Sequence, residues 1–492
     1  MKRIIAIILS LLIFFSSILV NVIVKDVCSV AKEQMNVVDV QMDGHGSAAL
    51  LSNGELYFWG EYYTDEGYED NRYFPEKIMA DVRTFAFKES VCAVIKNNGD
   101  LYTWGETYFN ILGHETHGID YCTPKKILEN IVDVKIIGLD TCIALSENGE
   151  VYTWGDGKYG SLGNGTTETC MLPQKIMDGV KSIEVDGFTV TALKDDDSLY
   201  AWGSGNLGLK KDENMNTLSP VYIMDGIKKA KVSKNNGWAI SVSGSLYVWG
   251  KEVKNMSWTE LSSAGFINLD SEKMYSPQKF KDNVIDAELF SGNDHFYMVQ
   301  CDDGKLYIGG WWRNKSYYGA PHLLKEDVKS FKITNGGSAL SVITQDNKLF
   351  LLGYYPEVDL DMDIEGVEFI NDVSAYIRDP FVSAVIKTNG DLYMWGDNYD
   401  GQCGTNICSG ENPDLNGNTW ITEPIKLDFS GTGNSSAEPD KDLSNYTEAK
   451  TVGTVGELYQ KESGLGKISL SCDETVFSKN ATTYHHDLAT FA

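Results

Sequence analysis

Leu56-Tyr57-Phe58-Trp59-Gly60 is the first copy of a five-residue phrase that recurs along the chain. The eight copies begin at Leu56, Leu101, Val151, Leu199, Leu246, Leu306, Leu349 and Leu392, and the copies at Leu306 and Leu349 lack the tryptophan. The aromatic second residues lie 43 to 60 residues apart, which is the size of one four-stranded propeller blade. The sequence therefore predicts an all-β fold, a β-propeller of eight repeat units over residues 36–430.

The other elements keep the same order in each unit. In the third unit, a first strand near 132–136 and a second near 142–145 precede the phrase. A proline at position 173 opens the last strand, and Pro75, Pro124, Pro277 and Pro424 stand at the matching places. Proline is tolerated at the first residue of a strand and on sheet edges. We therefore expect these prolines to begin the outer strand of each blade.

Tight turns before the phrase support the alignment of the units. Asn-Gly or Asp-Gly pairs end at Gly54, Gly99, Gly149, Gly304 and Gly390. Such pairs supply the positive φ that two-residue hairpin turns need. Where the glycine is missing, Asp197 and Asn347 take its place. Asp and Asn are the residues that best tolerate this conformation after glycine, so we expect positive φ at both.

Composition excludes several classes of protein. The chain has 492 residues and a net charge of -28, with 42% apolar residues and 47 glycines. This apolar content is typical of a globular protein and not of a disordered polyanion. Binding to phosphate needs clustered Lys and Arg, so the charge disfavours nucleic acid and anionic membrane surfaces as partners. We expect no nucleic-acid partner.

The N-terminus predicts export. Lys2 and Arg3 precede an apolar run over 4–24, and Ser29-Val30-Ala31 resembles a cleavage site. We expect a signal peptide over 1–31. The run is also long enough to cross a bilayer, so an uncleaved membrane anchor is the alternative. Both interpretations predict that the rest of the chain is secreted or lies on the outer surface.

The sequence contains little that could carry chemistry. The nine cysteines form no Cys-x-x-Cys pair, and Cys92 and Cys142 stand at matching strand positions, which favours small buried residues. Cys403 and Cys408 are close enough along the chain to form a disulfide. His114 and His117 lack zinc-protease spacing, and 359–365 reads as an acidic edge strand. We expect no catalytic residue, cofactor or metal, and hence no enzyme.

A second motif follows the phrase in some units and gives the chain a family resemblance. It reads Gly-x-Leu-Gly at 160–163 and 205–208, Gly-Gln-Cys-Gly at 401–404 and Asn-Ile-Leu-Gly at 110–113. Tyr-x-Trp-Gly followed by Gly-x-Leu-Gly resembles the repeats of the regulator of chromosome condensation family, over about residues 36–430. The resemblance implies a β-propeller, which in that family usually has seven blades. The repeats themselves number eight, so both counts are open.

The family's best-known members are nuclear guanine-nucleotide exchange factors, and this chain does not fit that role. The export signal and the acidic charge oppose it, and no exchange-site residue can be matched. We therefore expect no guanine-nucleotide-binding partner. Secreted bacterial members include propellers that inhibit β-lactamase through one face of the ring. The resemblance thus implies an exported propeller that presents one face to a protein.

Paired aromatics just after the phrase are the candidate binding residues. They lie in units one, six and seven, and unit five adds an insertion over 251–275 with two more aromatics. The candidates are Tyr62, Tyr63, Trp258, Phe266, Trp311, Trp312, Tyr317, Tyr318, Tyr354 and Tyr355. Tyr and Trp on loops either pack or bind, and both interpretations are open. The insertion is either a binding loop or a tolerated addition.

The end of the chain has a different composition. Residues 431–465 are rich in Gly, Ser, Asn and Asp, which predicts a linker. Residues 466–492 form a short C-terminal segment, in which Tyr484 to Ala489 faintly resembles the start of bacterial class 3 lipase-like hydrolase domains. No catalytic residue lies within it. This resemblance implies that the chain could be part of a longer hydrolase.

Three functions follow from these observations. The leading hypothesis is a non-catalytic extracellular propeller that binds a protein, as a scaffold, adhesion module or inhibitor. The second is a module that binds glycan or cell wall through the same aromatics. The third is the targeting domain of a longer secreted hydrolase.

Overall fold

A computed structural model describes residues 35–429 with gaps at 64–68, 89–90, 106–110, 115–122, 138–140, 206, 210–215, 233–235, 251–264, 268, 271–272, 274, 292–294, 313–314, 335–336, 356–359 and 408–418. The chain divides into two units, Met1–Asp440 and Lys441–Ala492, and every described residue belongs to the first. The predicted signal segment, linker and C-terminal segment lie outside the described residues. Within the described residues, no helix is long and apolar enough to cross a membrane.

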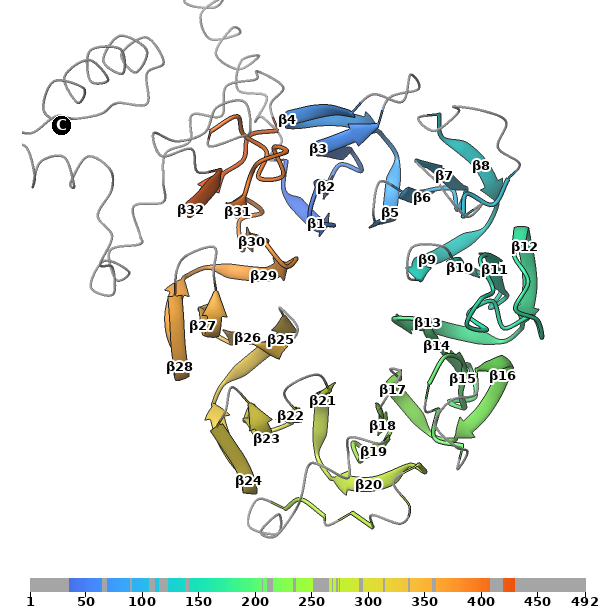
Figure 1. Ribbon diagram of the computed structural model, residues 1–492, viewed down its shortest axis with the longest axis vertical. Coiled ribbons are helices and arrows are strands. Elements are labelled where there is room, and N and C mark those ends of the chain that lie inside the picture. The colour runs from blue at the N-terminus through green and yellow to red at the C-terminus, as the bar shows by residue number, and fades with distance from the viewer. Residues whose placement is uncertain are drawn as a thin grey trace, which may run out of the picture. The chain divides into compact units, whose positions relative to one another are not determined.

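Eight four-stranded antiparallel sheets form a closed ring around a central axis (Figure 1). Each sheet is one blade, built from four consecutive strands, so the prediction of an eight-unit β-propeller is confirmed and the count of seven is wrong.

The strands fall into four concentric layers. The innermost are β1 (Val37–Met42), β5 (Val82–Lys88), β9 (Ile131–Ile137), β13 (Val180–Asp186), β17 (Ile227–Val232), β21 (Val284–Ser291), β25 (Val328–Thr334) and β29 (Val373–Arg378). The second are β2 (Gly46–Leu51), β6 (Val91–Lys96), β10 (Thr141–Ser146), β14 (Thr189–Lys194), β18 (Asn236–Ser241), β22 (His295–Cys301), β26 (Ala339–Thr344) and β30 (Val382–Lys387). The third, which carry the repeated phrase, are β3 (Leu56–Tyr63), β7 (Leu101–Gly105), β11 (Val151–Gly155), β15 (Leu199–Gly203), β19 (Leu246–Gly250), β23 (Leu306–Trp312), β27 (Leu349–Tyr355) and β31 (Leu392–Asp397). The outermost are β4 (Glu69–Met79), β8 (Lys125–Leu128), β12 (Cys170–Met177), β16 (Thr217–Met224), β20 (Gln278–Lys281), β24 (Lys315–Lys325), β28 (Leu360–Ile370) and β32 (Trp420–Lys426).

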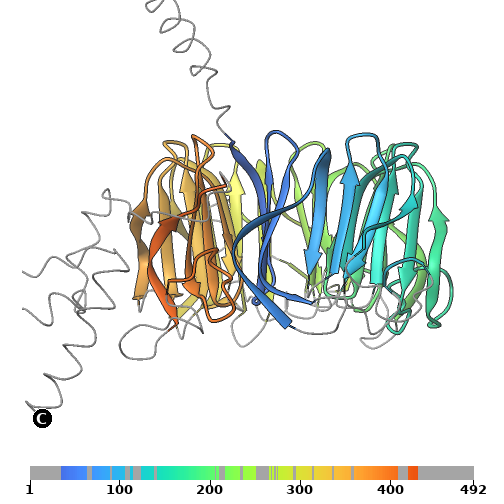
Figure 2. The same cartoon turned by 90° about the horizontal axis from the view of Figure 1, so that it is seen from above.

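The strands run between two rims of the ring (Figure 2). The turn rim holds the tight turns between second and third strands, and the loop rim is where the third strands end. At the turns, φ is 65° at Asp197 and 63° at Asn347, so the expected positive φ is confirmed.

One hydrogen bond on the turn rim recurs at every junction between blades. The carbonyl of the turn residue accepts from the first amide of the next inner strand, at 2.8–3.0 Å. The eight donor–acceptor pairs are Val82–Gly54, Ile131–Gly99, Val180–Gly149, Ile227–Asp197, Val284–Gly244, Val328–Gly304, Val373–Asn347 and Val37–Gly390. The last pair joins blade 8 to blade 1, so the ring closes with the same contact that its neighbours use.

The prolines of the outer strands correct one expectation. Pro124 and Pro277 directly precede β8 and β20, as predicted, but Pro75, Pro173 and Pro424 lie inside their strands. Each of these three falls where the register with the third strand shifts. The outer strand of a blade has an unpaired edge, and a bulge removes one more ladder contact. A proline therefore costs no hydrogen bond there.

The phrase's tryptophans lie within the ring and fill the space between blades. Trp59, Trp154, Trp202, Trp249 and Trp395 are fully buried. Burial of about 150–250 Å² for each indole contributes about 4–6 kcal/mol of gross hydrophobic stabilisation. The residue paired with each tryptophan on the second strand is small or β-branched, as with Cys92 and Cys142. Both cysteines are buried and free, as expected for small core residues.

Candidate functional site

The structure places the paired aromatics differently from the sequence prediction. Tyr62-Tyr63, Trp311-Trp312 and Tyr354-Tyr355 do not follow the third strands but are their last residues, and Tyr317-Tyr318 lie in β24. Blades 1, 6 and 7 have outer strands of 11 residues, whereas the other outer strands have 4 to 8. The aromatics thus belong to three extended hairpins at the loop rim. Blades 6 and 7 are neighbours in the ring, and blade 8 alone lies between blade 7 and blade 1.

Two candidates belong to the core, which favours packing, one of the two interpretations that the sequence left open for them. The indole of Trp312 is buried and donates to the carbonyl of Gly337 at 2.8 Å. Phe266 is buried and packs against Phe280 and Tyr297, with ring centroids 5.1 and 5.9 Å away. Trp258 lies outside the described residues, and the other seven candidates stay a prediction.

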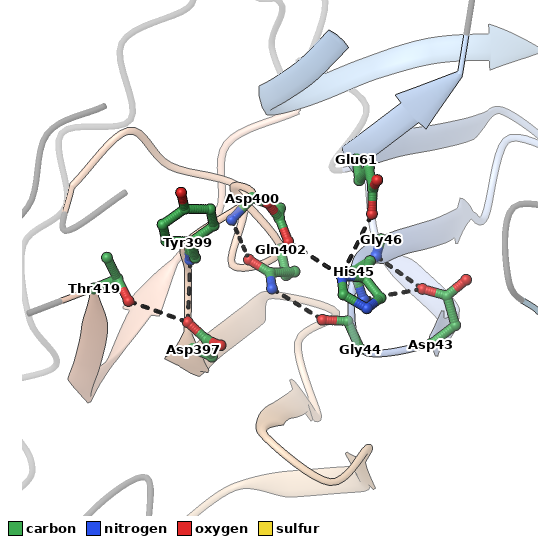
Figure 3. Close-up of polar contacts among 10 residues, drawn as sticks. All are labelled: Asp43, Gly44, His45, Gly46, Glu61, Asp397, Tyr399, Asp400, Gln402 and Thr419. Atoms are coloured by element: carbon green, nitrogen blue, oxygen red, sulfur yellow. Dashed lines mark hydrogen bonds and ion pairs between the residues drawn. The ribbon is translucent and has the colours of Figure 1, made fainter. Parts of the chain in front are cut away.

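The loop rim also carries a cluster that the sequence did not suggest, at the junction of blades 8 and 1. His45 lies between β1 and β2, Glu61 belongs to β3, and Asp400 follows β31 (Figure 3). His45 Nδ1 lies 3.4 Å from Glu61 Oε2 and 3.2 Å from Asp400 Oδ2. Both carboxylates therefore face the imidazole, and the three residues are named the seam cluster below.

The backbone around His45 is held in place from both blades. Asp43 Oδ1 accepts from the amides of Gly46 at 2.8 Å and His45 at 3.3 Å, and Gly44 has a φ of 90°. From blade 8, the Gln402 side chain donates to the Gly44 carbonyl and accepts from the Asp400 amide, both at 2.9 Å. One glutamine therefore connects the two loops that carry His45 and Asp400 (Figure 3).

Gln402 belongs to a Gly-x-Leu-Gly loop, which explains the second motif. The carbonyl of this loop position accepts the indole N–H of the next blade's tryptophan: Gln402 from Trp59 at 2.8 Å, Ile111 from Trp154 at 2.6 Å and Ser161 from Trp202 at 2.9 Å. A Cβ on the motif's last glycine, such as Gly163, would lie 2.7 Å from the Trp202 nitrogen. The motif is thus the receptor for the following blade, and here it also places Asp400.

The seam cluster differs in exposure from one residue to the next. The His45 side chain is 69% exposed, whereas Glu61 and Asp400 are 15% and 17% exposed. The hydrogen bond to Asp400 raises the pKa of His45, with burial opposing and Glu61 adding to the rise. Nearby, burial raises the pKa of the Asp379 carboxyl to about 6, and the charge of Asp43 adds to it. The junction therefore concentrates negative charge beside one accessible imidazole.

Exposed aromatic side chains adjoin this charge. Tyr399 is 57% exposed, and its amide donates to Asp397 Oδ1 at 3.1 Å. Phe381 is 52% exposed and packs edge-on against Trp420, with centroids 6.3 Å apart. The Asp397 amide in turn donates to the Phe381 carbonyl at 2.9 Å. Acidic and aromatic groups together suit recognition of a cationic partner surface.

This cluster could not be predicted from the sequence, because its residues form no motif of fixed spacing along the chain. His45 and Asp400 lie 355 residues apart along the chain and meet only when blade 8 closes on blade 1. The only signal in the sequence is Gln402 in the motif copy at 401–404, which contacts the loop of His45 across the junction. Among the described residues, the cluster is the one group of three His, Cys, Asp or Glu side chains with ligand atoms near enough to hold a metal ion.

Other expectations have mixed outcomes. Cys403 is buried, whereas Cys408 lies outside the described residues, so a disulfide between them stays a prediction. The acidic segment from Leu360 to Glu365 is part of β28, an outer strand, as expected. His114 is described and half-buried, and His117 is not described.

Comparison with known proteins finds repeats of one family. Two family models, both described as the regulator of chromosome condensation (RCC1) repeat, match residues 148–187 and 131–161. No curated protein matches the chain.

Solved structures show weak likeness. Human WBSCR16 is 14% identical over 61% of this chain and 85% of its own, with a TM-score of 0.44. Prp20p from Saccharomyces cerevisiae is 20% identical over 59% and 77%, with a TM-score of 0.43. Yeast RCC1 (Prp20) bound to Kap60 is 17% identical over 77% and 86%, with a TM-score of 0.44. These likenesses carry no argument about function. The repeat matches and the eight four-stranded blades together support a β-propeller of the RCC1-repeat kind.

Proposed function

We propose that the protein is a non-catalytic extracellular propeller that binds a protein partner through its loop rim. One observation carries the proposal: the exposed Tyr399 directly precedes Asp400 of the seam cluster, and the exposed Phe381 is tied to the same segment through its carbonyl, which accepts from the Asp397 amide. A rigid ring that displays aromatic and charged groups together has the composition of a recognition surface. The extracellular setting rests on the N-terminal segment over 1–31.

The extended hairpins give this surface its extent. All third strands end at the loop rim, so the hairpins of blades 6, 7 and 1 share that rim with the seam cluster. We define the rim arc as these three hairpins together with Phe381, Tyr399 and the seam cluster. It covers consecutive blades from 6 to 1, and it lies in a chain of net charge -28. A partner with exposed Lys and Arg is therefore favoured, through steering and cation–π contacts.

Capture from culture supernatant tests the proposal with a paired set of variants. The full chain is used as bait beside a Phe381→Ala/Tyr399→Ala double variant. A Leu172→Ala/Tyr222→Ala double variant is the control, because both of its residues are exposed on outer strands away from the seam. We expect one protein to be captured by the wild type and by the control, and its capture to be lost or at least tenfold reduced with the Phe381→Ala/Tyr399→Ala variant. Equal capture by all three would reject the rim arc as the binding surface.

Glycan binding is the second outcome that the experiment can reveal. Stacking of sugars on exposed aromatics would change the intrinsic fluorescence when soluble peptidoglycan fragments are added. A response that the Phe381→Ala/Tyr399→Ala variant loses, together with no captured protein, would replace the protein partner by a glycan. The targeting of a hydrolase rests on the C-terminal segment and stays a prediction.

A further inference from the structure

We propose that His45, Glu61 and Asp400 bind a divalent transition-metal ion, with Zn²⁺ as the favoured ion, across the junction of blades 8 and 1. The proposal does not depend on the identity of any partner of the rim arc. It rests on the types of ligand atom, their separations and the way in which both blades hold them.

The ligand types suit zinc. Imidazole nitrogen and carboxylate oxygen are both zinc ligands, and a histidine disfavours calcium and magnesium, which prefer oxygen. Thiolates are absent from the cluster, so it does not resemble a closed structural site of the Cys type. A fourth position would remain for water, because His45 is largely exposed.

The distances agree with a shared ion. Zinc bonds of about 2.0–2.2 Å in tetrahedral geometry place neighbouring ligand atoms about 3.3–3.6 Å apart. The imidazole Nδ1 lies 3.4 Å from the Glu61 oxygen and 3.2 Å from the Asp400 oxygen. All three ligand atoms lie within 4.8 Å of one another.

Hydrogen bonds to the backbone hold the three segments that carry the ligands in position. The Glu61 amide donates to the His45 carbonyl at 2.9 Å, which fixes the distance between these two backbones. Gln402 holds the Asp400 amide and the Gly44 carbonyl at once. Such outer contacts orient metal ligands before the ion arrives and so lower the cost of binding.

Electrostatics favour a cation at this place. Two carboxylates face the site, and Asp43 and Asp379 contribute further negative charge nearby. The competing arrangement is a protonated His45 paired with both carboxylates. An ion would replace that proton, and it would also bridge two blades whose residues lie at opposite ends of the chain.

Zinc titration of the full chain tests the proposal. After dialysis against a chelator, calorimetry should detect a zinc-binding component that is lost or at least tenfold weaker in His45→Ala and in Asp400→Asn. Asp400→Asn keeps the size of the side chain, and His45 is exposed, so neither substitution removes core packing. His322→Ala is the matched control, because His322 is an exposed histidine on β24. It should bind zinc as the wild type does.

The chain has other histidines, including His485 and His486, which could bind zinc by themselves. The informative quantity is therefore the difference between wild type and the seam variants, not total binding. Zinc should also raise the Tm of the wild type and of His322→Ala, and leave the Tm of His45→Ala unchanged. Zinc affinity and Tm shifts that are equal in all four proteins would overturn the proposal, and the seam cluster would then be an ion pair alone.

Discussion

The phenol ring of Tyr297 fills the space beside Gly309, at the position where six other blades carry the tryptophan of the repeated phrase. The two residues are paired on β22 and β23, and a Cβ on Gly309 would lie 2.2 Å from the Tyr297 oxygen. In blades that keep the tryptophan, its partner is a residue such as Ser47, Cys142 or Gly237. Blade 6 therefore exchanges the large and the small residue between its two strands.

A double-mutant cycle tests this exchange. Gly309→Trp alone should overfill the junction and destabilise the protein by about 1–3 kcal/mol or more. Tyr297→Cys alone should leave a cavity and cost a similar amount. Because the double variant restores the pattern of blade 3, its loss should be at least about 1 kcal/mol smaller than the sum. Urea unfolding of the four proteins gives the coupling, and strict additivity would contradict the volume exchange.

The indole hydrogen bonds between blades should be separable from the packing of the rings. Trp202→Phe keeps a buried ring but leaves the Ser161 carbonyl without its donor, which costs about 1–3 kcal/mol beyond the change in packing. Trp395→Phe is the control, because the Trp395 nitrogen is buried and has no hydrogen-bond partner among the described residues. We expect Trp202→Phe to lower the Tm more than Trp395→Phe does. Equal losses would mean that the hydrogen bond adds nothing measurable.

The last glycine of the Gly-x-Leu-Gly motif should be intolerant for two reasons. Gly163 has a φ of 65°, and an added Cβ would meet the Trp202 indole. Gly187 has a φ of 58°, but an added Cβ would meet nothing within 4 Å. Gly187→Ala should therefore show only backbone strain of about 1–2 kcal/mol, and Gly163→Ala about 1–3 kcal/mol more. Urea midpoints of the two variants provide the comparison, and a milder effect at Gly163 would refute the contact.

Asp379 should make stability depend on pH near the seam. Its pKa in the folded state is raised to about 6 from 3.8. The folded protein thus holds this proton more tightly, so the stabilisation is complete below pH 3.8 and is lost as the pH rises through 6. Asp379→Asn should be more stable than the wild type at pH 8, and the gain should vanish near pH 4. Tm measured at both pH values decides, and an equal gain at the two would exclude the titration of Asp379.

The repeated parts of the fold could be predicted from sequence because their determinants are local. A tight turn requires a residue with positive φ at a fixed place within a few residues. Asp197 and Asn347 occupy that place in the two units without glycine, so the turn could be predicted there as well. Whether Trp312 packs or binds could not be decided from sequence, because it lies three residues beyond the position of the lost tryptophan, outside the pattern that the aligned units share. Pro173 is expected at the start of a strand but lies inside β12, at a bulge. A bulge depends on the register with a second strand, which the sequence around Pro173 does not contain.

The seam cluster could not be predicted, since it depends on ring closure. Its first and last members come from different blades, and no spacing along the chain relates them. The loss of the tryptophan from two copies of the phrase can also be compared with the sequence of the preceding unit. Units five and six lack the Gly-x-Leu-Gly motif, and the units that follow them, six and seven, lack the tryptophan that it would receive. The correlation is incomplete, because units one and seven also lack the motif, and yet Trp104 and Trp395 are present in the units that follow them.

The turn-rim contact at the last junction has a consequence for chain topology. Each blade is made from one continuous stretch of chain. The Val37 amide donates to the Gly390 carbonyl in the same way as the first amides of the other seven inner strands do at their junctions. Beyond β32, Phe429 packs edge-on against Tyr57 of blade 1, with centroids 5.1 Å apart, so both ends of the ring reach the same blade. The blade at which the chain begins is therefore arbitrary for folding: a circular permutant that joins residue 429 to residue 35 by a linker, and opens between any two other blades, should assemble the same ring.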